Sequence, residues 1–217
     1  MEKIYTIPVN ESFEECMENQ APECPFCRLY NKLEENELDL ILGASMMEPD
    51  IRMQTNELGF CGKHYAMMFG RKNRLGLALI LESHLDSIRE NMDIKDLEKL
   101  DSTCYLCGRI ERFLTKMIET AVFLYDTDPD FERKLRSQKL ICLPHYRRAV
   151  SYGKARLNKK KFIVFNDIIT EVTLNYFDEL RGDVKWFCKK FDYRYESEPW
   201  RNSKDAIERA IRFLKRQ

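Results

Sequence analysis

The spacing of apolar residues along the chain predicts a protein built from α-helices. The most periodic stretch runs over residues 162–191, where apolar side chains recur on average about every 3.6 residues, the period of an α-helix. We interpret this stripe as core. Its members are Phe162, Phe165, Ile169, Val172, Tyr176, Leu180, Val184, Phe187 and Phe191. Gly182 is expected to kink or break this long helix.

Shorter apolar patterns and helix-capping residues predict further helices. The expected ranges are 11–17 after an Asn10 cap, 29–42, 49–59, 64–70, 74–91, 106–125, 129–137, 144–155 and 203–216 after a capping box of Asn202 and Asp205. The charged stretch 93–101 is expected to join two repeats, and 191–200 to be irregular. With eight Gly and seven Pro there are too few turn positions for a β-sandwich or barrel. We therefore expect an all-α fold of about eight helices.

Composition and charge narrow the function classes. The 217 residues include 36 basic and 36 acidic side chains, so the net charge is zero and the overall field of a dedicated nucleic-acid binder is missing. The basic runs at 71–74 and 159–161 are interpreted as solvated helix ends. No segment reaches the ~18 to 20 consecutive apolar residues that span a bilayer, and the N-terminus has no apolar signal region. These patterns predict a cytoplasmic location, no membrane contact and reduced cysteines.

Most of the cysteines and histidines fall into four short pairs. Two pairs have the pattern C-x-x-C and two have C-x-x-H, which together use six of eight cysteines and two of three histidines. The pairs are Cys24–Cys27, Cys61–His64, Cys104–Cys107 and Cys142–His145. Alternating pairs at this spacing are far from chance and are typical of metal sites.

The pairs belong to an internal duplication with a period of about 80 residues. Cys27 precedes Cys61 by 34 positions and Cys107 precedes Cys142 by 35. Glu-Pro-Asp at 48–50 corresponds to Asp-Pro-Asp at 128–130, and a Tyr follows both paired histidines. We predict one domain over 1–217, with repeats at about 20–91 and 102–160 and a C-terminal helical region at 161–217.

Three thiolates and one imidazole are the ligands of a tetrahedral metal site, above all of Zn²⁺. Pro25 and Pro144 predict that two of the pairs open helices, since proline is tolerated in the first helical turn. We expect pairing within each repeat, hence two structural zinc ions per chain. The quartets would be Cys24, Cys27, Cys61 and His64, and then Cys104, Cys107, Cys142 and His145. Four protein ligands close a site and favour a structural role.

Other interpretations of the same residues remain open. The main alternative function is a thiol–zinc redox or metal sensor, in which oxidation expels the metal. Further alternatives are a dithiol oxidoreductase that uses Cys24 and Cys27, an iron–sulfur cluster, and disulfides. No catalytic constellation is predicted, because His84 stands alone and is interpreted as an ordinary helix residue. Cys16 and Cys188 are expected to be buried free thiols.

Several segments also resemble a known family. They are YTIPV at 5–9, CPFC at 24–27, GASMMEPDIR at 43–52, GFCGKHY at 59–65 and NRLGLAL at 73–79. These segments resemble an uncharacterised family of bacterial cytosolic proteins, mainly from Gram-positive anaerobes, with duplicated CPxC…CxxH motifs. Some of its members are labelled ABC-transporter substrate-binding proteins. The resemblance implies no known activity or substrate, and the family's paired positions coincide with the eight residues above. We expect a zinc-binding scaffold for an unknown protein partner.

Overall fold

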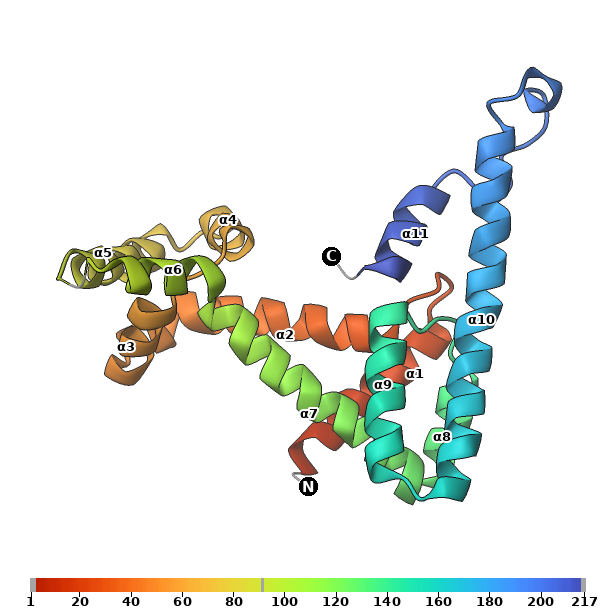
Figure 1. Ribbon diagram of the computed structural model, residues 1–217, viewed down its shortest axis with the longest axis horizontal. Helices are drawn as coiled ribbons and strands as arrows, with labels where there is room; N and C mark the ends of the chain where they lie inside the picture. The colour runs from red at the N-terminus through yellow and green to blue at the C-terminus, as the bar shows by residue number, and fades with distance from the viewer. Residues whose placement is uncertain (1–2, 91, 216–217) are drawn as a thin grey trace. The chain divides into compact units, whose positions relative to one another are not determined.

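The computed structural model describes residues 3–90 and 92–215, and over these residues the chain is helical and without strands (Figure 1). The α-helices are α1 (Thr6–Glu18), α2 (Pro25–Leu42), α3 (Pro49–Leu58), α4 (Gly62–Gly70), α5 (Arg74–Glu90), α6 (Ile94–Ser102), α7 (Tyr105–Thr127), α8 (Pro129–Arg136), α9 (Leu143–Arg156), α10 (Lys159–Lys189) and α11 (Ala206–Leu214). Three short 3₁₀ turns are η1 (Lys3–Tyr5), η2 (Ala44–Met47) and η3 (Tyr193–Tyr195). The all-α prediction is confirmed. The predicted count of about eight helices is too low, since the described residues form eleven.

Helix α6 is the element that the sequence pattern missed, because its charged residues were interpreted as a linker. Asp93 caps it, with its carboxylate accepting a hydrogen bond from the Lys95 N–H at 3.2 Å. Ile94, Leu97 and Leu100 follow at steps of three residues, which gives this short helix one apolar side. A helix with so narrow an apolar stripe looks like a solvated linker in sequence.

Two predicted helix caps were wrong. Helix α1 begins at Thr6, so Asn10 lies inside it and donates a hydrogen bond to the Thr6 carbonyl at 3.0 Å. Helix α11 begins after Asp205, without the capping box proposed for Asn202. The Asn202 amide instead contacts the Asp183 carboxylate at 3.2 Å. The expected ends at 91 and 216 lie outside the described residues.

The described helices form two compact units. Unit 1 comprises Met1–Leu29 and Lys116–Gln217, and unit 2 comprises Tyr30–Thr115. The boundaries fall inside α2 and inside α7 and do not coincide with the predicted repeats at 20–91 and 102–160. That the chain folds as one domain stays a prediction.

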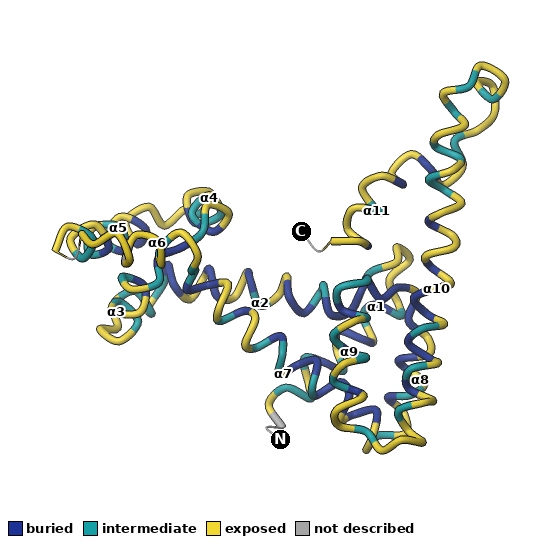
Figure 2. Tube along the Cα trace, in the orientation of Figure 1, coloured by how far each residue is buried: buried dark blue, intermediate teal, exposed yellow. Residues whose placement is uncertain are grey.

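In unit 1 the long helix α10 packs against α8, α9 and α11, and α1 packs against α8. The predicted stripe is buried from Phe165 to Leu180, whereas Val184 and Phe187 are half-buried and Phe191 is 75% exposed. Figure 2 shows this change from buried to exposed along α10. Gly182 does not break the helix, which is continuous from Lys159 to Lys189. The core interpretation therefore holds for the middle of the stripe and fails at its C-terminal end.

Unit 2 is built around the packing of α3 on α5, with α4 and α6 beside them. Its fully buried side chains include Leu38, Ile41, Met68, Ile80 and Ile110. Within the described part of the chain, no helix combines the length and the hydrophobicity that crossing a bilayer requires.

Candidate metal centres

All four Cys/His pairs have the same local geometry at the N-terminus of a helix. Cys61 and Cys142 are the N-cap residues of α4 and α9, and Cys24 and Cys104 directly precede α2 and α7. In each pair the carbonyl of the first cysteine accepts the N–H four residues later, at 2.8 to 3.0 Å. The second ligand therefore lies in the first helical turn, on the same side as the first. The helix starts expected from Pro25 and Pro144 are confirmed.

The structure brings the eight predicted ligands into two groups that could each hold a metal ion. Site A consists of Cys24, Cys27, Cys142 and His145, and site B of Cys61, His64, Cys104 and Cys107. Within each group the ligand atoms all lie within 4.8 Å of one another. The predicted pairing within each repeat was wrong, because each C-x-x-C pair meets the C-x-x-H pair of the other repeat. Site A lies in unit 1 and site B in unit 2.

Contacts around α1 explain how site A forms. The Ser12 hydroxyl donates to the Pro25 carbonyl at 2.8 Å, and the Gln138 amide donates to the Phe13 carbonyl at 3.0 Å. The Phe13 ring also packs edge-on against Phe26, with centroids 5.4 Å apart. Helix α1 is thus bonded both to the start of α2 and to the segment that leads into α9. These packed contacts hold Cys24 and Cys27 next to Cys142 and His145.

Site B is held by hydrogen bonds between two connecting segments. The Thr103 hydroxyl donates to the Leu58 carbonyl at 2.8 Å, and the Tyr105 N–H donates to the Gly59 carbonyl at 3.0 Å. These bonds fasten the α6–α7 junction to the α3–α4 junction. The cysteines that follow, Cys61 and Cys104, are thereby brought together.

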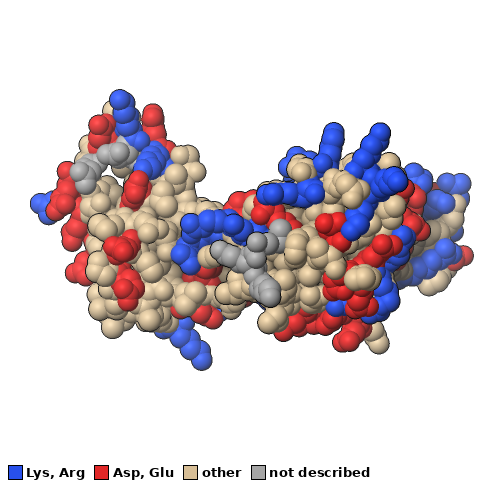
Figure 3. All heavy atoms as spheres, turned by 90° about the horizontal axis from the view of Figure 1, so that it is seen from below, with Lys and Arg blue, Asp and Glu red and all other residues tan. Residues whose placement is uncertain are grey.

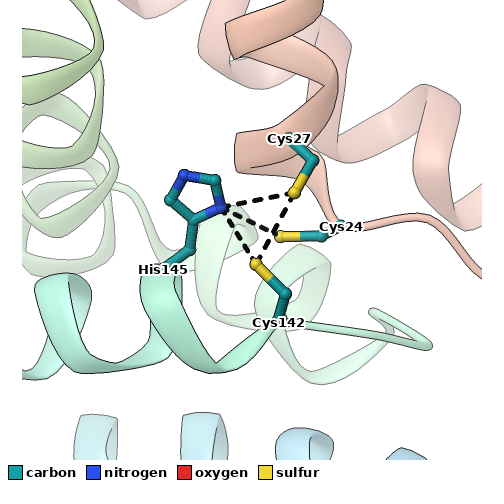
Figure 4. A group of neighbouring side chains, drawn as sticks. All are labelled: Cys24, Cys27, Cys142 and His145. Atoms are coloured by element: carbon teal, nitrogen blue, oxygen red, sulfur yellow. Dashed lines mark hydrogen bonds between the residues drawn. The ribbon is translucent and has the colours of Figure 1, made fainter. Parts of the chain in front are cut away.

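The interatomic distances of site A fit a single tetrahedral ion. His145 Nδ1 lies 3.7, 3.4 and 3.2 Å from the sulfurs of Cys24, Cys27 and Cys142, and all four side chains point toward one another (Figure 4). Cys27 Sγ and Cys142 Sγ are 3.5 Å apart. Around Zn²⁺, bonds of ~2.3 Å to sulfur and ~2.05 Å to nitrogen would give S–S distances of ~3.8 Å and S–N distances of ~3.6 Å.

Hydrogen bonding alone does not account for this convergence. One imidazole nitrogen carries either one N–H or one lone pair, so it cannot bond three sulfurs at once. A cation at the centre of the four atoms could accept a bond from each of them. The donor set and its spacing therefore fit a bound metal.

Site B has the same geometry. His64 Nδ1 lies 3.3, 3.2 and 3.4 Å from the sulfurs of Cys61, Cys104 and Cys107. Cys61 Sγ and Cys107 Sγ are 3.8 Å apart. Burial lowers the pKa of His64 although Glu34 acts in the opposite direction, which favours the neutral imidazole that a metal ligand requires.

Neighbouring thiols shift the pKa of Cys27, Cys107 and Cys61. Hydrogen bonds with Cys142 and Cys24, together with burial, raise the pKa of Cys27 far above its ordinary value. Burial and the neighbouring Cys104 raise the pKa of Cys107 to about 12. Burial acts against ionisation of Cys61 too, but backbone N–H groups of α4 and the other thiols of site B lower its pKa. A cation would remove the repulsion between adjacent thiolates, so metal binding and proton release are coupled.

Sequence reasoning missed one residue of site B, Glu34. Its carboxylate is almost buried, and Oε1 lies 3.2 Å from His64 Nε2. The same oxygen accepts hydrogen bonds at 2.7 Å from Lys63 Nζ and from the Tyr30 hydroxyl. Glu34 thus fixes the His64 ring with Nδ1 toward the sulfurs. The sequence holds only a weak signal for this role of Glu34, namely its position four residues after Tyr30 on α2.

The two sites differ in their exposure to solvent. In site A, Cys24, Cys142 and His145 are at most 2% exposed, and the Phe26 ring packs beside His145 with centroids 5.7 Å apart. In site B, His64 is fully buried, whereas Cys61 and Cys104 are half-buried and Cys107 is exposed. One side of site B therefore faces solvent.

The remaining candidates from the sequence lie outside both sites. His84 is buried in α5 and its Nδ1–H donates to the Asn56 carbonyl at 3.1 Å, as expected of an ordinary helix residue. Cys16 is buried, and burial raises the pKa of its thiol to about 12. Cys188 is exposed, so its predicted burial was wrong: it lies in the C-terminal part of α10, where the helix leaves the core. The basic residues at 159–161 are exposed, as expected.

Comparison with known proteins places the chain in a family. The chain belongs to the family described as "Family of unknown function (DUF6062)", which it matches twice, over residues 1–99 and 91–217. Two matches to one family are partly consistent with the internal duplication. No curated protein and no solved structure matches the chain.

Proposed function

We propose that this protein binds two Zn²⁺ ions, one at each site, and that the ions have a structural role. The observation that carries the proposal is the convergence of four helix N-termini into two closed sets of three sulfurs and one nitrogen. Site A would tie the start of α2 to the start of α9, and site B the start of α4 to the start of α7. With four protein ligands at each ion, no position is left for a substrate.

The geometry supports zinc over the alternative centres. The cysteines are free, and the S–S distances of 3.5 and 3.8 Å are far longer than the ~2.05 Å of a disulfide. An iron–sulfur cluster places several iron and sulfide atoms between its ligands and needs wider spacing than one ion. A dithiol oxidoreductase needs an accessible attacking thiol, whereas Cys24 is only 2% exposed. A single tetrahedral cation fits the ligands best.

Metal analysis of untagged protein tests this proposal. The expected result is about two zinc ions per chain by mass spectrometry of the metals. After replacement by Co²⁺, the visible spectrum should be that of tetrahedral cobalt with thiolate charge transfer. Iron with inorganic sulfide would overturn the assignment to zinc. A purified protein that stays folded without any metal would overturn the structural role.

We further propose that the protein is a scaffold that binds another protein. This part is supported by aromatic side chains on the surface after α10, since Phe191 is 75% and Tyr193 is 84% exposed. Large exposed aromatic groups are typical anchors at interfaces. Nucleic acid is a poorer candidate because the net charge is zero and both signs occur over the face shown in Figure 3. A cytoplasmic location and an origin in Gram-positive bacteria stay predictions.

Affinity purification with a matched variant tests the scaffold role. A specific partner should be retained by the wild-type protein and lost with the double variant Phe191→Ser and Tyr193→Ser. Both proteins should carry the same amount of zinc, because the two residues lie outside sites A and B. Equal retention by both proteins would contradict a role for these aromatic residues.

A further inference from the structure

Cys107 is the most accessible ligand of the two sites. It is exposed, while the other two cysteines of site B and Cys27 of site A are half-buried and the remaining cysteine ligands are buried. Susceptibility of a cysteine to oxidants depends on its thiolate character and its exposure. A zinc-bound cysteine is already a thiolate, so exposure decides which sulfur of a loaded site reacts first.

Cys107 differs from the other two cysteines of site B in its contacts with backbone N–H groups. Cys104 Sγ accepts the backbone N–H of Cys107 at 3.4 Å, and the backbone N–H groups of Lys63 and His64 at the start of α4 lower the pKa of Cys61. Such bonds withdraw electron density from sulfur and lower its nucleophilicity. Within the described residues, the contacts of Cys107 Sγ are with other ligand atoms of site B.

We propose that Cys107 is an oxidation site through which hydrogen peroxide releases the zinc of site B, while site A keeps its zinc. This inference rests on the proposed binding of zinc. In the first step, the Cys107 thiolate attacks peroxide: an S–O bond forms, the O–O bond breaks, and hydroxide leaves. Two electrons pass from sulfur to peroxide, and Cys107 becomes a sulfenic acid.

Cys61 is placed for the second step because its sulfur lies 3.8 Å from that of Cys107. The Cys61 thiolate attacks the sulfenic sulfur, the S–S bond forms, the S–O bond breaks, and a second hydroxide leaves. In total, two thiolates and one peroxide give one disulfide and two hydroxide ions. Only His64 and Cys104 then remain as ligands, too few to hold zinc tightly.

The disulfide would preserve the connection between the two helix starts of site B. It would link residues 61 and 107, at the beginning of α4 and in the first turn of α7. Unit 2 would therefore exchange a metal crosslink for a covalent one and not unfold. A thiol reductant together with zinc should restore the original site.

The test uses the zinc-loaded full chain with Cys188→Ser, which removes the exposed cysteine outside the sites. Zinc content is measured first: a value other than about two per chain would count against the proposed function itself. Hydrogen peroxide is then added, released zinc is followed with a chromogenic chelator, and cysteines are mapped by differential alkylation and mass spectrometry. We expect one zinc released per chain, a Cys61–Cys107 disulfide, and unmodified Cys24, Cys27 and Cys142.

A matched pair of variants isolates the role of Cys107. Cys107→His retains four ligands at site B without the exposed thiolate, and its release of zinc should be at least tenfold slower. Cys27→His makes the same change at site A and should leave the release from site B at the wild-type rate. Simultaneous loss of both zinc ions, earlier oxidation of Cys27 or Cys142, or equal rates in Cys107→His and wild type would overturn the proposal. If Cys107→His fails to retain zinc, the identity of the cysteines that are oxidised first in the Cys188→Ser protein tests the proposal without this variant.

Discussion

His64 and Glu34 form a buried pair in which imidazole Nε2 lies 3.2 Å from carboxylate Oε1. The opposite ring nitrogen, Nδ1, is thereby directed to the three sulfurs of site B. Carboxylates in this position fix the tautomer and raise the basicity of a histidine ligand. In site A the ring of His145 packs beside Phe26 instead. The two sites thus have the same types of ligand, three cysteines and one histidine each, but differ in the residue that lies against the histidine.

Replacing Glu34 by Ala should weaken metal binding at site B. Loss of a carboxylate that orients a histidine ligand typically lowers metal affinity ~10- to 100-fold. Competition with a chelator should therefore show that one zinc ion per chain is bound more weakly than in the wild type and that the other is bound with unchanged affinity. Glu35→Ala is the matched control, because Glu35 is the next residue on α2 and pairs on the surface with Arg71. Unchanged affinity in Glu34→Ala would show that Glu34 does not support the site.

The sequence was sufficient to predict which eight residues form the two candidate metal sites, but not how their pairs combine. Helical periodicity and Pro25 and Pro144 locate the helix starts, because both are local properties. The four pairs, however, are chemically alike, and nothing in their spacing tells which two meet. The choice depends on long-range contacts such as Gln138 with Phe13 and Thr103 with Leu58. These contacts join segments that are distant in the chain, where hydrophobic patterns carry no information.

Cys61→Ser distinguishes the observed pairing from pairing within a repeat. The variant should retain about one zinc per chain, with site A intact. Cys104 and Cys107 should then react rapidly with iodoacetamide, whereas Cys24 and Cys27 should stay protected. The exposed Cys188 serves as the internal standard, since it should react in every sample. Rapid labelling of Cys24 and Cys27, with Cys104 and Cys107 protected, would instead support pairing within each repeat.

Removal of zinc with a chelator should affect unit 2 more than unit 1. Unit 2 spans 30–115, while unit 1 has the larger share of the chain and includes the long helix α10. A smaller unit buries less apolar surface and depends more on its crosslink. Hydrogen exchange should therefore accelerate most in α4 and at the start of α7. Acceleration in α8, α9 and α10 as large as that in α4 would show that both units depend equally on metal.

Gly59→Ala should destabilise unit 2 and site B together. Gly59 has a φ of 54°, a region that alanine rarely adopts, and an added Cβ would lie 3.2 Å from Leu100 and 3.3 Å from His84 Nε2. The Gly59 carbonyl also accepts the Tyr105 N–H that brings the two halves of site B together. Backbone strain of this kind costs ~1 to 3 kcal/mol, so we expect a lower melting temperature and weaker zinc retention at site B.

Gly182→Ala provides the matched control for this substitution. Gly182 lies inside α10 with nothing within 4 Å of an added Cβ. Alanine is favoured over glycine inside a helix by ~1 kcal/mol, so this variant should melt at the same or a higher temperature and keep both zinc ions. Thermal melts monitored by circular dichroism, with zinc content measured in parallel, check the expected fall in melting temperature for Gly59→Ala and the expected equal or higher value for Gly182→Ala. If Gly59→Ala matched the wild-type protein in stability and zinc retention, the positive-φ turn before Cys61 would not be needed to assemble site B.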